Sequence, residues 1–480
     1  MARVTRFWQG APRRGLGAAR VGRKEDRTGS SLRIALTGFV LALSVLAGSL
    51  LVPAWSFADT PRLFEGVASC GGTMCHGRLE ADGKIVRQDE LARWQEASTQ
   101  GGAHSRAFTI LSGTRARQIT ATLGLGDPSA APACLGCHAT PATARGPRFR
   151  ASDGVGCEAC HGPASGWIAS HYAVGASHAA NVSRGMIALD RPTVRAGVCL
   201  DCHLGSGRAG QFVTHRMMSA GHPRLSFELD LFSTLQQHHN EDADYAARKG
   251  RSDGVQMWAV GQALAVNRAL TLYGDPARGS EGAFPEFSFF DCHSCHRPIY
   301  DRETRTRTWE SNPGRPIPAG MPPFNDENMI LLSAAARVAA PALAGRFDAD
   351  ARAFHAALAR DRPAAVAEGR KLAATASALA DRIAAGGTGG DTAFAMVDLL
   401  ASPTLEPRFT DYTGSAQAVM AVDTLLNALV KQGRITIGAA AGIRVNINRA
   451  YVAVREPNGY RPAEFRSALR DAVRAIRVLR

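Results

Sequence analysis

The sequence predicts a mainly α-helical fold, in which a loop-rich core precedes a C-terminal helical region. Residues 59–312 are rich in Gly, Pro and His and lack the periodic apolar stripes with which a helical domain buries itself. All ten cysteines lie in this stretch, in five pairs that are each followed directly by histidine. Residues 313–480 have no cysteine and are rich in Ala and Leu at helical spacing. We therefore expect two domains, 59–312 and 313–480.

The first 58 residues have the pattern of an export signal. A basic stretch precedes an uncharged run, Ile34–Val52, and the small residues Ser56 and Ala58 come just before Asp59. Cleavage after Ala58 and retention as an N-terminal anchor both stay open, because about 20 apolar residues can span a bilayer. Either way, we expect the remainder outside the cytoplasm, in the periplasm.

The charge does not indicate a nucleic-acid partner. The formal net charge is +14, and residues 1–58 account for half of it, with nine Lys/Arg against two Asp/Glu. The remaining chain contains no basic cluster with stacking aromatics and no nucleic-acid-binding motif, so we expect no such partner.

The cysteine pairs have the spacing of covalent haem attachment. Two thiols must reach the two vinyl groups of one porphyrin, and the next residue must bring its imidazole to the iron as proximal ligand. Four of the motifs are C-x-x-C-H, and the first has four residues between its cysteines, a looser version of the same arrangement. The motifs are Cys70/Cys75/His76, Cys134/Cys137/His138, Cys157/Cys160/His161, Cys199/Cys202/His203 and Cys292/Cys295/His296.

Other uses of paired cysteines fit less well. Zinc sites and disulfides place no demand on the residue after the second cysteine. A thioredoxin-like pair would occur once, in a βαβ context. The sequence therefore predicts five covalently bound haem c groups and leaves no thiol for catalysis.

The stretch from Ser69 to about Pro298 resembles the multihaem cytochromes grouped with cytochrome c-554, relatives of hydroxylamine oxidoreductase. The most recognisable run is Asp153–Pro163 around the third motif, and Pro285–Phe287 before the last motif also matches. Ala103–Phe108 is similar to the family segment that bears a distal histidine, and His215–Leu225 is also family-like. The resemblance implies a multihaem cytochrome c core and leaves the C-terminal region unexplained.

Nine histidines remain as candidates for the distal position. An iron with a second histidine is closed and shuttles electrons, whereas an iron without one is open to substrate. Three candidates lie in family-like segments, and His171 follows the third motif by ten residues. His239 is a weaker fifth candidate, Met217 or Met218 is an alternative ligand, and His178, His293 and His355 are assigned no role. We expect the distal ligands to be His104, His171, His215, His222 and His239.

Helices are expected on both sides of a proline-rich loop at Pro313–Pro323. The segment Gln256–Tyr273 before it has an amphipathic pattern. After the loop, Pro403/Pro407, Gly386/Gly387 and Gly433/Gly438 act as breakers. The expected helices are Glu327–Leu343, Asp348–Ala359, Ala364–Ala385, Thr392–Leu400, Tyr412–Lys431 and Glu464–Leu479.

The sequence favours an electron carrier and leaves an enzyme open. In the first case, closely spaced haems connect redox partner proteins, and the helical region would support the core or dock it onto a membrane respiratory complex. In the second, one open haem would act on a small nitrogen or sulfur compound. Iron coordination distinguishes the two.

Overall fold

The computed structural model describes residues 61–80, 88–239, 241–281, 284–300, 302, 305, 307–318 and 320–480. The expected export signal at residues 1–58 lies outside these residues. Residues Pro61–Arg480 form one compact unit. Within the described part of the chain, every helix is too short or too polar to cross a membrane.

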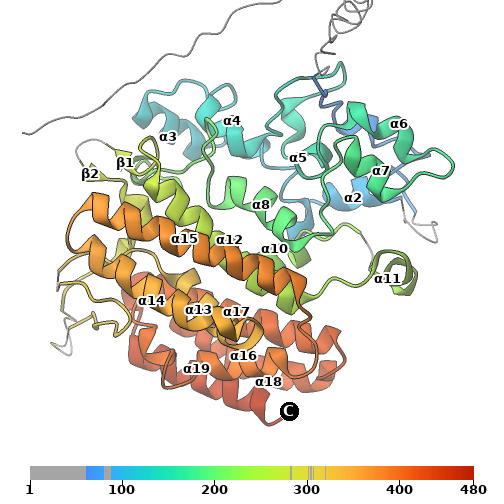
Figure 1. The fold of residues 1–480 in the computed structure, drawn as a ribbon. Coiled ribbons are helices and arrows are strands. Elements are labelled where there is room, and N and C mark those ends of the chain that lie inside the picture. Colours follow the sequence, from blue (N-terminus) through green and yellow to red (C-terminus); the bar gives the residue numbers. More distant parts are fainter. Residues whose placement is uncertain are drawn as a thin grey trace, which may run out of the picture. The chain divides into compact units, whose positions relative to one another are not determined.

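The described chain is mainly helical, as predicted, with one short hairpin formed by β1 and β2 (Figure 1). Its first part consists of short helices joined by loops and single 3₁₀ turns. The turns in this part are Val67–Ser69, Gln100–Gly102, Thr109–Ser112, Ala151–Asp153, Ala164–Gly166, Phe287–Phe289 and Cys292–Ser294, and two more, Glu406–Arg408 and Pro457–Gly459, lie among the later helices. The helices and strands up to the hairpin are α2 (Glu90–Trp94), α3 (Thr114–Leu123), α4 (Pro132–His138), α5 (Cys157–His161), α6 (Ile168–His171), α7 (His178–Ser183), α8 (Pro192–His203), α9 (His215–Ser219), α10 (Leu229–Leu235), α11 (Ala243–Lys249), α12 (Gly254–Gly274), β1 (Ser280–Glu281) and β2 (Phe284–Pro285).

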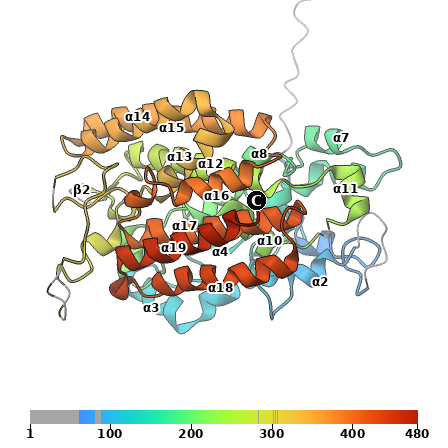
Figure 2. The same ribbon diagram turned by 90° about the horizontal axis from the view of Figure 1, so that it is seen from below.

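The second part is built from longer helices that lie against one another (Figures 1 and 2). Most follow the expected ranges, because their apolar faces recur at the helical period. These helices are α13 (Glu327–Ala339), α14 (Pro341–Leu358), α15 (Arg362–Ala385), α16 (Thr392–Leu400), α17 (Tyr412–Lys431), α18 (Ile437–Ala453) and α19 (Pro462–Arg477).

Two helix assignments made from the sequence were wrong. The helix expected to run to Leu343 ends at Ala339, and α14 begins at Pro341, because proline fits the first position of a new helix and not the interior of an old one. Helix α18 was missed, because Gly438 was interpreted as a breaker. It lies in the first turn of α18, whose N-cap Thr436 accepts a hydrogen bond from Ala439 N.

One large apolar core joins α12 to the C-terminal helices. Helix α12 precedes the proline-rich loop, yet it packs along α15 and against α13 and α17 (Figure 2). Trp258 is fully buried in this core together with Phe354 and Phe465. The division at residues 312/313 stays a prediction, and α12 lies in the same core as the helices beyond it.

The loop-rich part has little apolar core of its own. Among the residues that the structure describes, one separate cluster contains Ala196, Leu200, Leu229, Met257 and Ala265. Nine other described apolar side chains before residue 196 are buried but belong to neither cluster: Trp94, Leu111, Ile119, Ala131, Ala139, Phe149, Ala164, Trp167 and Ala188. The protein atoms alone therefore give this part few apolar contacts.

A buried ion network fastens the proline-rich loop to the helices. Arg315 Nε donates to Asp326 Oδ2 at 2.7 Å, and Arg315 Nη2 donates to Asp411 Oδ2 at 2.7 Å. All three side chains are buried. Asp326 and Asp411 are the N-cap residues of α13 and α17, so one guanidinium holds two helix ends.

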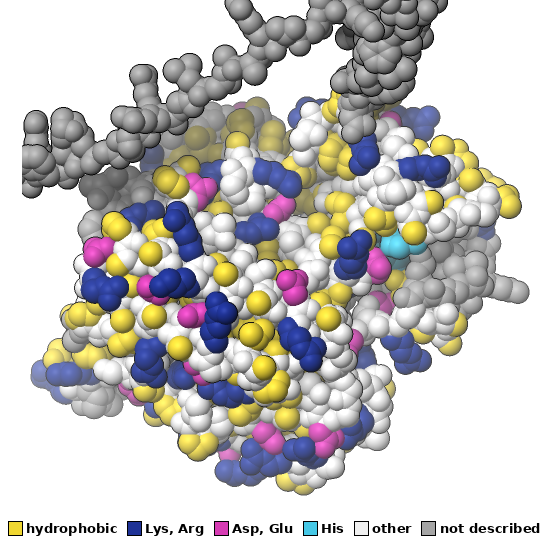
Figure 3. All heavy atoms as spheres, in the orientation of Figure 1, with side chains coloured by type: hydrophobic (Ala, Val, Ile, Leu, Met, Phe, Trp, Pro, Cys, Tyr) yellow, Lys and Arg dark blue, Asp and Glu magenta, His cyan; other side chains and the backbone are white. Residues whose placement is uncertain are grey.

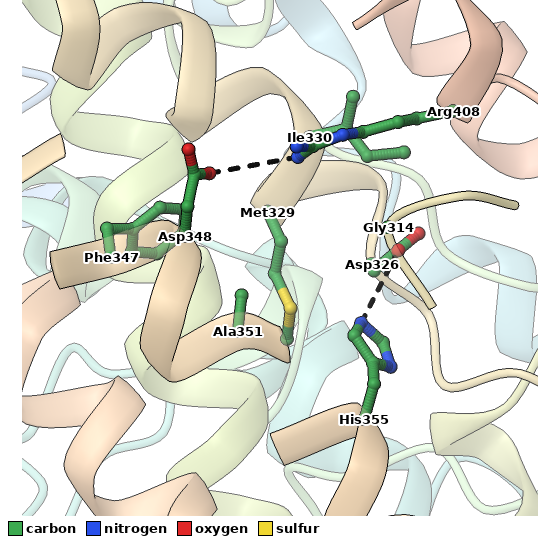
Figure 4. Close-up of a pocket in the computed structure, with 9 residues that line it drawn as sticks. All are labelled: Gly314, Asp326, Met329, Ile330, Phe347, Asp348, Ala351, His355 and Arg408. Carbon is green, nitrogen blue, oxygen red and sulfur yellow. Dashed lines mark ion pairs between the residues drawn. The ribbon is translucent and has the colours of Figure 1, made fainter. Parts of the chain in front are cut away.

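His355 belongs to the same network. Its Nε2 lies 3.5 Å from Asp326 Oδ2, beside a cavity of about 20 Å³ that is large enough for about one water molecule (Figure 4). On the other side of that cavity Arg408 faces Asp348 at 3.7 Å. The arrangement is that of a paired core histidine.

The outer face of the molecule carries mixed charge. Basic and acidic side chains are interspersed over the face drawn in Figure 3. Many form surface ion pairs, such as Arg434 with Asp391 at 2.6 Å and Arg477 with Asp398 at 2.8 Å. Exposed pairs of this kind contribute little to stability.

Candidate functional site

The five cysteine motifs are called sites 1 to 5 in sequence order, and four of them lie on helical turns. Helices α4, α5 and α8 each end at the motif histidine, and site 5 begins with the turn Cys292–Ser294. In a helix, residues i, i+3 and i+4 share one face. The C-x-x-C-H spacing therefore presents both thiols and the imidazole on the same side.

Site 1 reaches a similar arrangement through a looped turn. Its His76 N donates to Cys70 O at 3.1 Å, and Cys75 N donates to Gly72 O at 2.8 Å, so the two additional residues bulge outward. A Cβ added at Gly77 would lie 2.0 Å from Gly71 O, so the turn needs glycine there.

Among the cysteines of the four regular motifs, Cys295 at site 5 is the one with an exposed side chain. Its side chain is exposed, as is that of Cys75 at site 1, whereas the other eight cysteines, Cys292 among them, are half-buried.

The backbone at site 5 nevertheless keeps the geometry of the motif. Cys295 N donates to Cys292 O at 3.2 Å, and His296 N donates to the same oxygen at 2.9 Å. Cys292 Sγ also lies 3.5 Å from Arg224 Nη1, which fixes the first thiol. The assignment of Cys295 as a haem-binding residue stays a prediction, which rests on its spacing from Cys292 and not on burial.

Each motif histidine faces a second histidine from elsewhere in the chain. The ring centroids are 6.1 Å apart for His76 and His171. The remaining pairs are His104 with His203 at 6.2 Å, His138 with His222 at 6.4 Å, His215 with His296 at 6.4 Å, and His161 with His239 at 6.2 Å or His238 at 6.4 Å.

These separations fit an iron between the two rings. On each side of the iron, a metal–nitrogen bond of about 2 Å and a ring radius of about 1.1 Å separate the metal from the ring centroid. The centroids of the two axial rings are therefore roughly 6.3 Å apart. Unliganded imidazoles in direct contact would approach more closely, as His238 and His239 do at 4.2 Å. The residues therefore fit haem with histidine on both faces.

The structure brings all five expected distal candidates next to a motif histidine, although their role as ligands stays a prediction. With five histidine pairs present, Met217 and Met218 are not needed to complete the set.

Sequence reasoning overlooked His238. Its ring lies about as close to His161 as that of His239 does. One ring nitrogen from each of His161, His238 and His239 lies within 4.8 Å of the other two. The sequence signal was the adjacent pair His238-His239 itself, in which either ring could be turned toward the site.

Burial keeps several of these imidazoles neutral. It lowers the pKa of His161 to about 3, with a smaller effect from His239 and His238. It also lowers the pKa of His203 and of His238 to about 4. A metal binds the deprotonated nitrogen, so these rings are ready to coordinate iron at neutral pH without first losing a proton.

The second residue of the C-E-A-C-H motif fastens site 3 to the segment before site 1. The buried Glu158 carboxylate accepts backbone hydrogen bonds from Glu65 N at 2.8 Å, Gly66 N at 2.7 Å and Ala164 N at 2.7 Å. Three donors of this kind satisfy a buried carboxylate that would otherwise be costly.

Sites 1 and 3 lie side by side, and so do sites 3 and 4. The Cys70 and Cys157 thiols are close enough to influence each other: Cys157 raises the pKa of Cys70, and Cys70 lowers the pKa of Cys157. Helix α5 with site 3 packs against α8 with site 4. Burial, together with the nearby Cys199 thiol, raises the pKa of Cys160 to about 12.

Sites 4 and 2 also touch, through the loop around Gln211. Gln211 Nε2 donates to Gly136 O at 3.0 Å and contacts Cys202 Sγ at 3.6 Å. The backbones are so close that a Cβ on Gly136 would lie 2.4 Å from Gly210 O. The Cys137 and Cys202 thiols also influence each other, because Cys202 raises the pKa of Cys137 and Cys137 lowers the pKa of Cys202.

Site 5 connects to site 2 through α9 and the turn that follows it. His215 opens α9 and faces site 5, whereas His222, seven residues later, faces site 2. Glu286, ahead of site 5, holds the start of this helix by accepting a hydrogen bond from His215 N at 2.6 Å. The spatial order of the sites is therefore 1–3–4–2–5.

Comparison with known proteins gives one family match. Residues 69–162, which contain sites 1 to 3, match the model of the family described as cytochrome c554 and c-prime. No significant match was found among curated proteins or among solved structures.

Proposed function

We propose that this c-type cytochrome is an exported electron-transfer protein that carries five covalently bound haem c groups, each with histidine on both faces. The observation that carries the proposal is the set of five histidine pairs with ring centroids 6.1–6.4 Å apart. Bound haem supplies one-electron iron chemistry, and two histidines close the iron to substrate.

The spatial order of the sites supports a route for electrons. Neighbouring sites touch through their cysteines, through α5 and α8, or through α9. The row 1–3–4–2–5 has site 1 at one end and site 5 at the other. We propose that partner proteins outside the cytoplasm donate and accept electrons at these two ends, where Cys75 and Cys295 are the two exposed thiols.

An oxidoreductase acting on a small nitrogen or sulfur compound is the alternative. It requires one motif histidine without a second ring, which would leave the iron open. In the part of the chain that the structure describes, each of the five has a histidine opposite it, which favours the electron carrier.

The helical part extends this proposal to a larger assembly. Because α13–α19 contain a large core and no cysteine, we propose that they support α12 and α8 behind sites 4 and 5. Docking onto a membrane respiratory complex through this part is a further proposal, which co-purification with membrane components would test.

The haem number can be measured directly. We expect the mass of the intact mature protein to exceed that of its polypeptide by five haem groups, because all ten cysteines are paired in motifs. The double variant Cys70→Ala/Cys75→Ala should carry four. A wild-type protein with four haems would exclude site 1, whose motif is the irregular one.

Iron coordination tests the function. We expect the wild-type holoprotein to be fully low-spin by optical and electron paramagnetic resonance (EPR) spectroscopy, and its reduced form not to bind carbon monoxide. His222→Ala should convert one haem of five to high-spin and admit about one equivalent of carbon monoxide, because His222 is the ring opposite His138.

The matched control is His178→Ala, which removes an exposed histidine paired with Asp190 at 3.0 Å and should leave the spectrum unchanged. A wild-type protein that binds carbon monoxide would support the enzyme instead. A low-spin His222→Ala variant would show that His222 is not an axial ligand.

A further inference from the structure

One carboxylate lies between histidines of two different sites. Glu90 Oε2 is 2.9 Å from His76 Nδ1 at site 1, and Glu90 Oε1 is 3.5 Å from His239 Nδ1 at site 3. Glu90 is only 6% exposed, so water screens these contacts weakly. Both contacts use Nδ1 and leave Nε2 of each ring as the nitrogen available for iron.

Three other histidines that face a second ring have a neutral carbonyl oxygen at Nδ1. His138 Nδ1 lies 2.8 Å from Ala107 O, His222 Nδ1 lies 2.8 Å from Pro223 O, and His238 Nδ1 lies 3.2 Å from Gln236 O. His76 and His239, by contrast, each have a carboxylate at Nδ1, and in both cases that carboxylate belongs to Glu90.

The local fold fixes Glu90 in this place. It is the first residue of α2, and the loop that leads to it is closed by hydrogen bonds from Arg78 N to Gln88 O and from Leu91 N to His76 O. At the other end of α2, Trp94 Nε1 donates to Val155 O at 3.1 Å, just ahead of site 3. Helix α2 is therefore anchored to both sites that Glu90 touches.

A carboxylate that accepts a hydrogen bond from a ligating imidazole orients the ring and makes it more basic. A more basic axial ligand stabilises ferric over ferrous iron, and the negative charge nearby acts in the same direction. A neutral carbonyl group at the same nitrogen orients the ring and increases its basicity to a smaller extent.

We propose that Glu90 is a positioning residue shared by sites 1 and 3, which lowers the reduction potentials of both haems together and makes this end of the row the low-potential end. The inference rests on the proposed function, because it requires haem iron at both sites. It also assigns His239, and not His238, as the histidine opposite His161, since the carboxylate contact orients His239.

The test is a redox titration of the five-haem protein and its Glu90→Gln variant. Glutamine keeps the size and hydrogen-bonding ability of the side chain and removes its charge. We expect two of the five midpoint potentials, the lowest pair, to rise and three to stay. A tenfold change in the oxidised-to-reduced equilibrium of a haem shifts its midpoint potential by about 59 mV for one electron.

Asp89→Asn is the matched control. It removes a carboxylate one residue away that pairs with Arg93 at 3.1 Å, and the two low potentials should stay in place. The bridge is overturned if Glu90→Gln moves no potential or only one, or if Asp89→Asn moves the same pair equally.

A second readout needs no change at Glu90. His239→Ala should open the site 3 haem to carbon monoxide, and His238→Ala should not. The reverse outcome would overturn the assignment of His239.

These experiments distinguish a failure of the Glu90 inference from a failure of the electron-carrier proposal. An open haem in the wild-type protein contradicts the electron-carrier proposal whatever Glu90 does. Five closed haems with unmoved potentials in Glu90→Gln contradict the inference alone.

Discussion

Arg315→Met is expected to reduce the free energy of unfolding by about 3–5 kcal/mol, the usual cost of removing one partner from a buried ion pair. The guanidinium binds the buried carboxylates of Asp326 and Asp411 at 2.7 Å. Methionine fills much of the same volume but leaves two buried charges without a cation. Because Asp326 and Asp411 are the N-cap residues of α13 and α17, the loss should spread through the helical core.

Denaturant unfolding, followed by the helical circular dichroism signal, would measure this cost. The control is Arg477→Met, which removes an exposed arginine paired with Asp398 at 2.8 Å and should cost at most about 1 kcal/mol. An Arg315→Met variant as stable as this control would mean that the network contributes no more than a surface pair.

The chain produced without haem attachment is expected to fold only in its helical part. Almost all the clustered apolar core comes from residues 212–476, whereas the buried side chains from Trp94 to Ala188 join no cluster. The faces of the porphyrins proposed at sites 1 to 4 would supply the missing apolar contacts. Without them, the first part cannot offset its loss of conformational entropy.

Limited proteolysis with mass mapping checks this expectation. Cleavages should concentrate between residues 61 and about 250 and leave a resistant fragment that begins near α12. In the haem-loaded protein, the same protease should leave both parts intact. Uniform resistance of the haem-free chain would show that the loop-rich part folds on its own, and digestion of α12–α19 would show that the helical core depends on the haem part.

The sequence alone identified what is local. The C-x-x-C-H spacing must satisfy one porphyrin within five consecutive residues, so the motif can be recognised without a fold. The long helices were equally local, because their apolar period is repeated within each segment. Helix α18 escaped because its glycines suggested a break, and the contacts that stabilise it come from α17 and α19.

The distal histidines and the exposed thiols show the limit of that local information. Residue type and neighbouring residues marked His104 and His222 as candidates, but nothing local indicated that His104 faces His203 or that His222 faces His138. Spacing likewise treated Cys295 as equal to the other motif cysteines, whereas only the fold leaves it exposed. Nothing local indicated that His239 would lie against Glu90.

The sequence by itself therefore identified the five cysteine–histidine motifs, the attachment chemistry that their spacing predicts, and most of the long helices. Only the tertiary structure decided the partner of each histidine, the order 1–3–4–2–5 and the position of Glu90 between two sites. The physical reason is distance along the chain. Thioether attachment is satisfied by neighbours in sequence, whereas an axial pair or a shared carboxylate exists only once packing brings remote segments within a few ångströms.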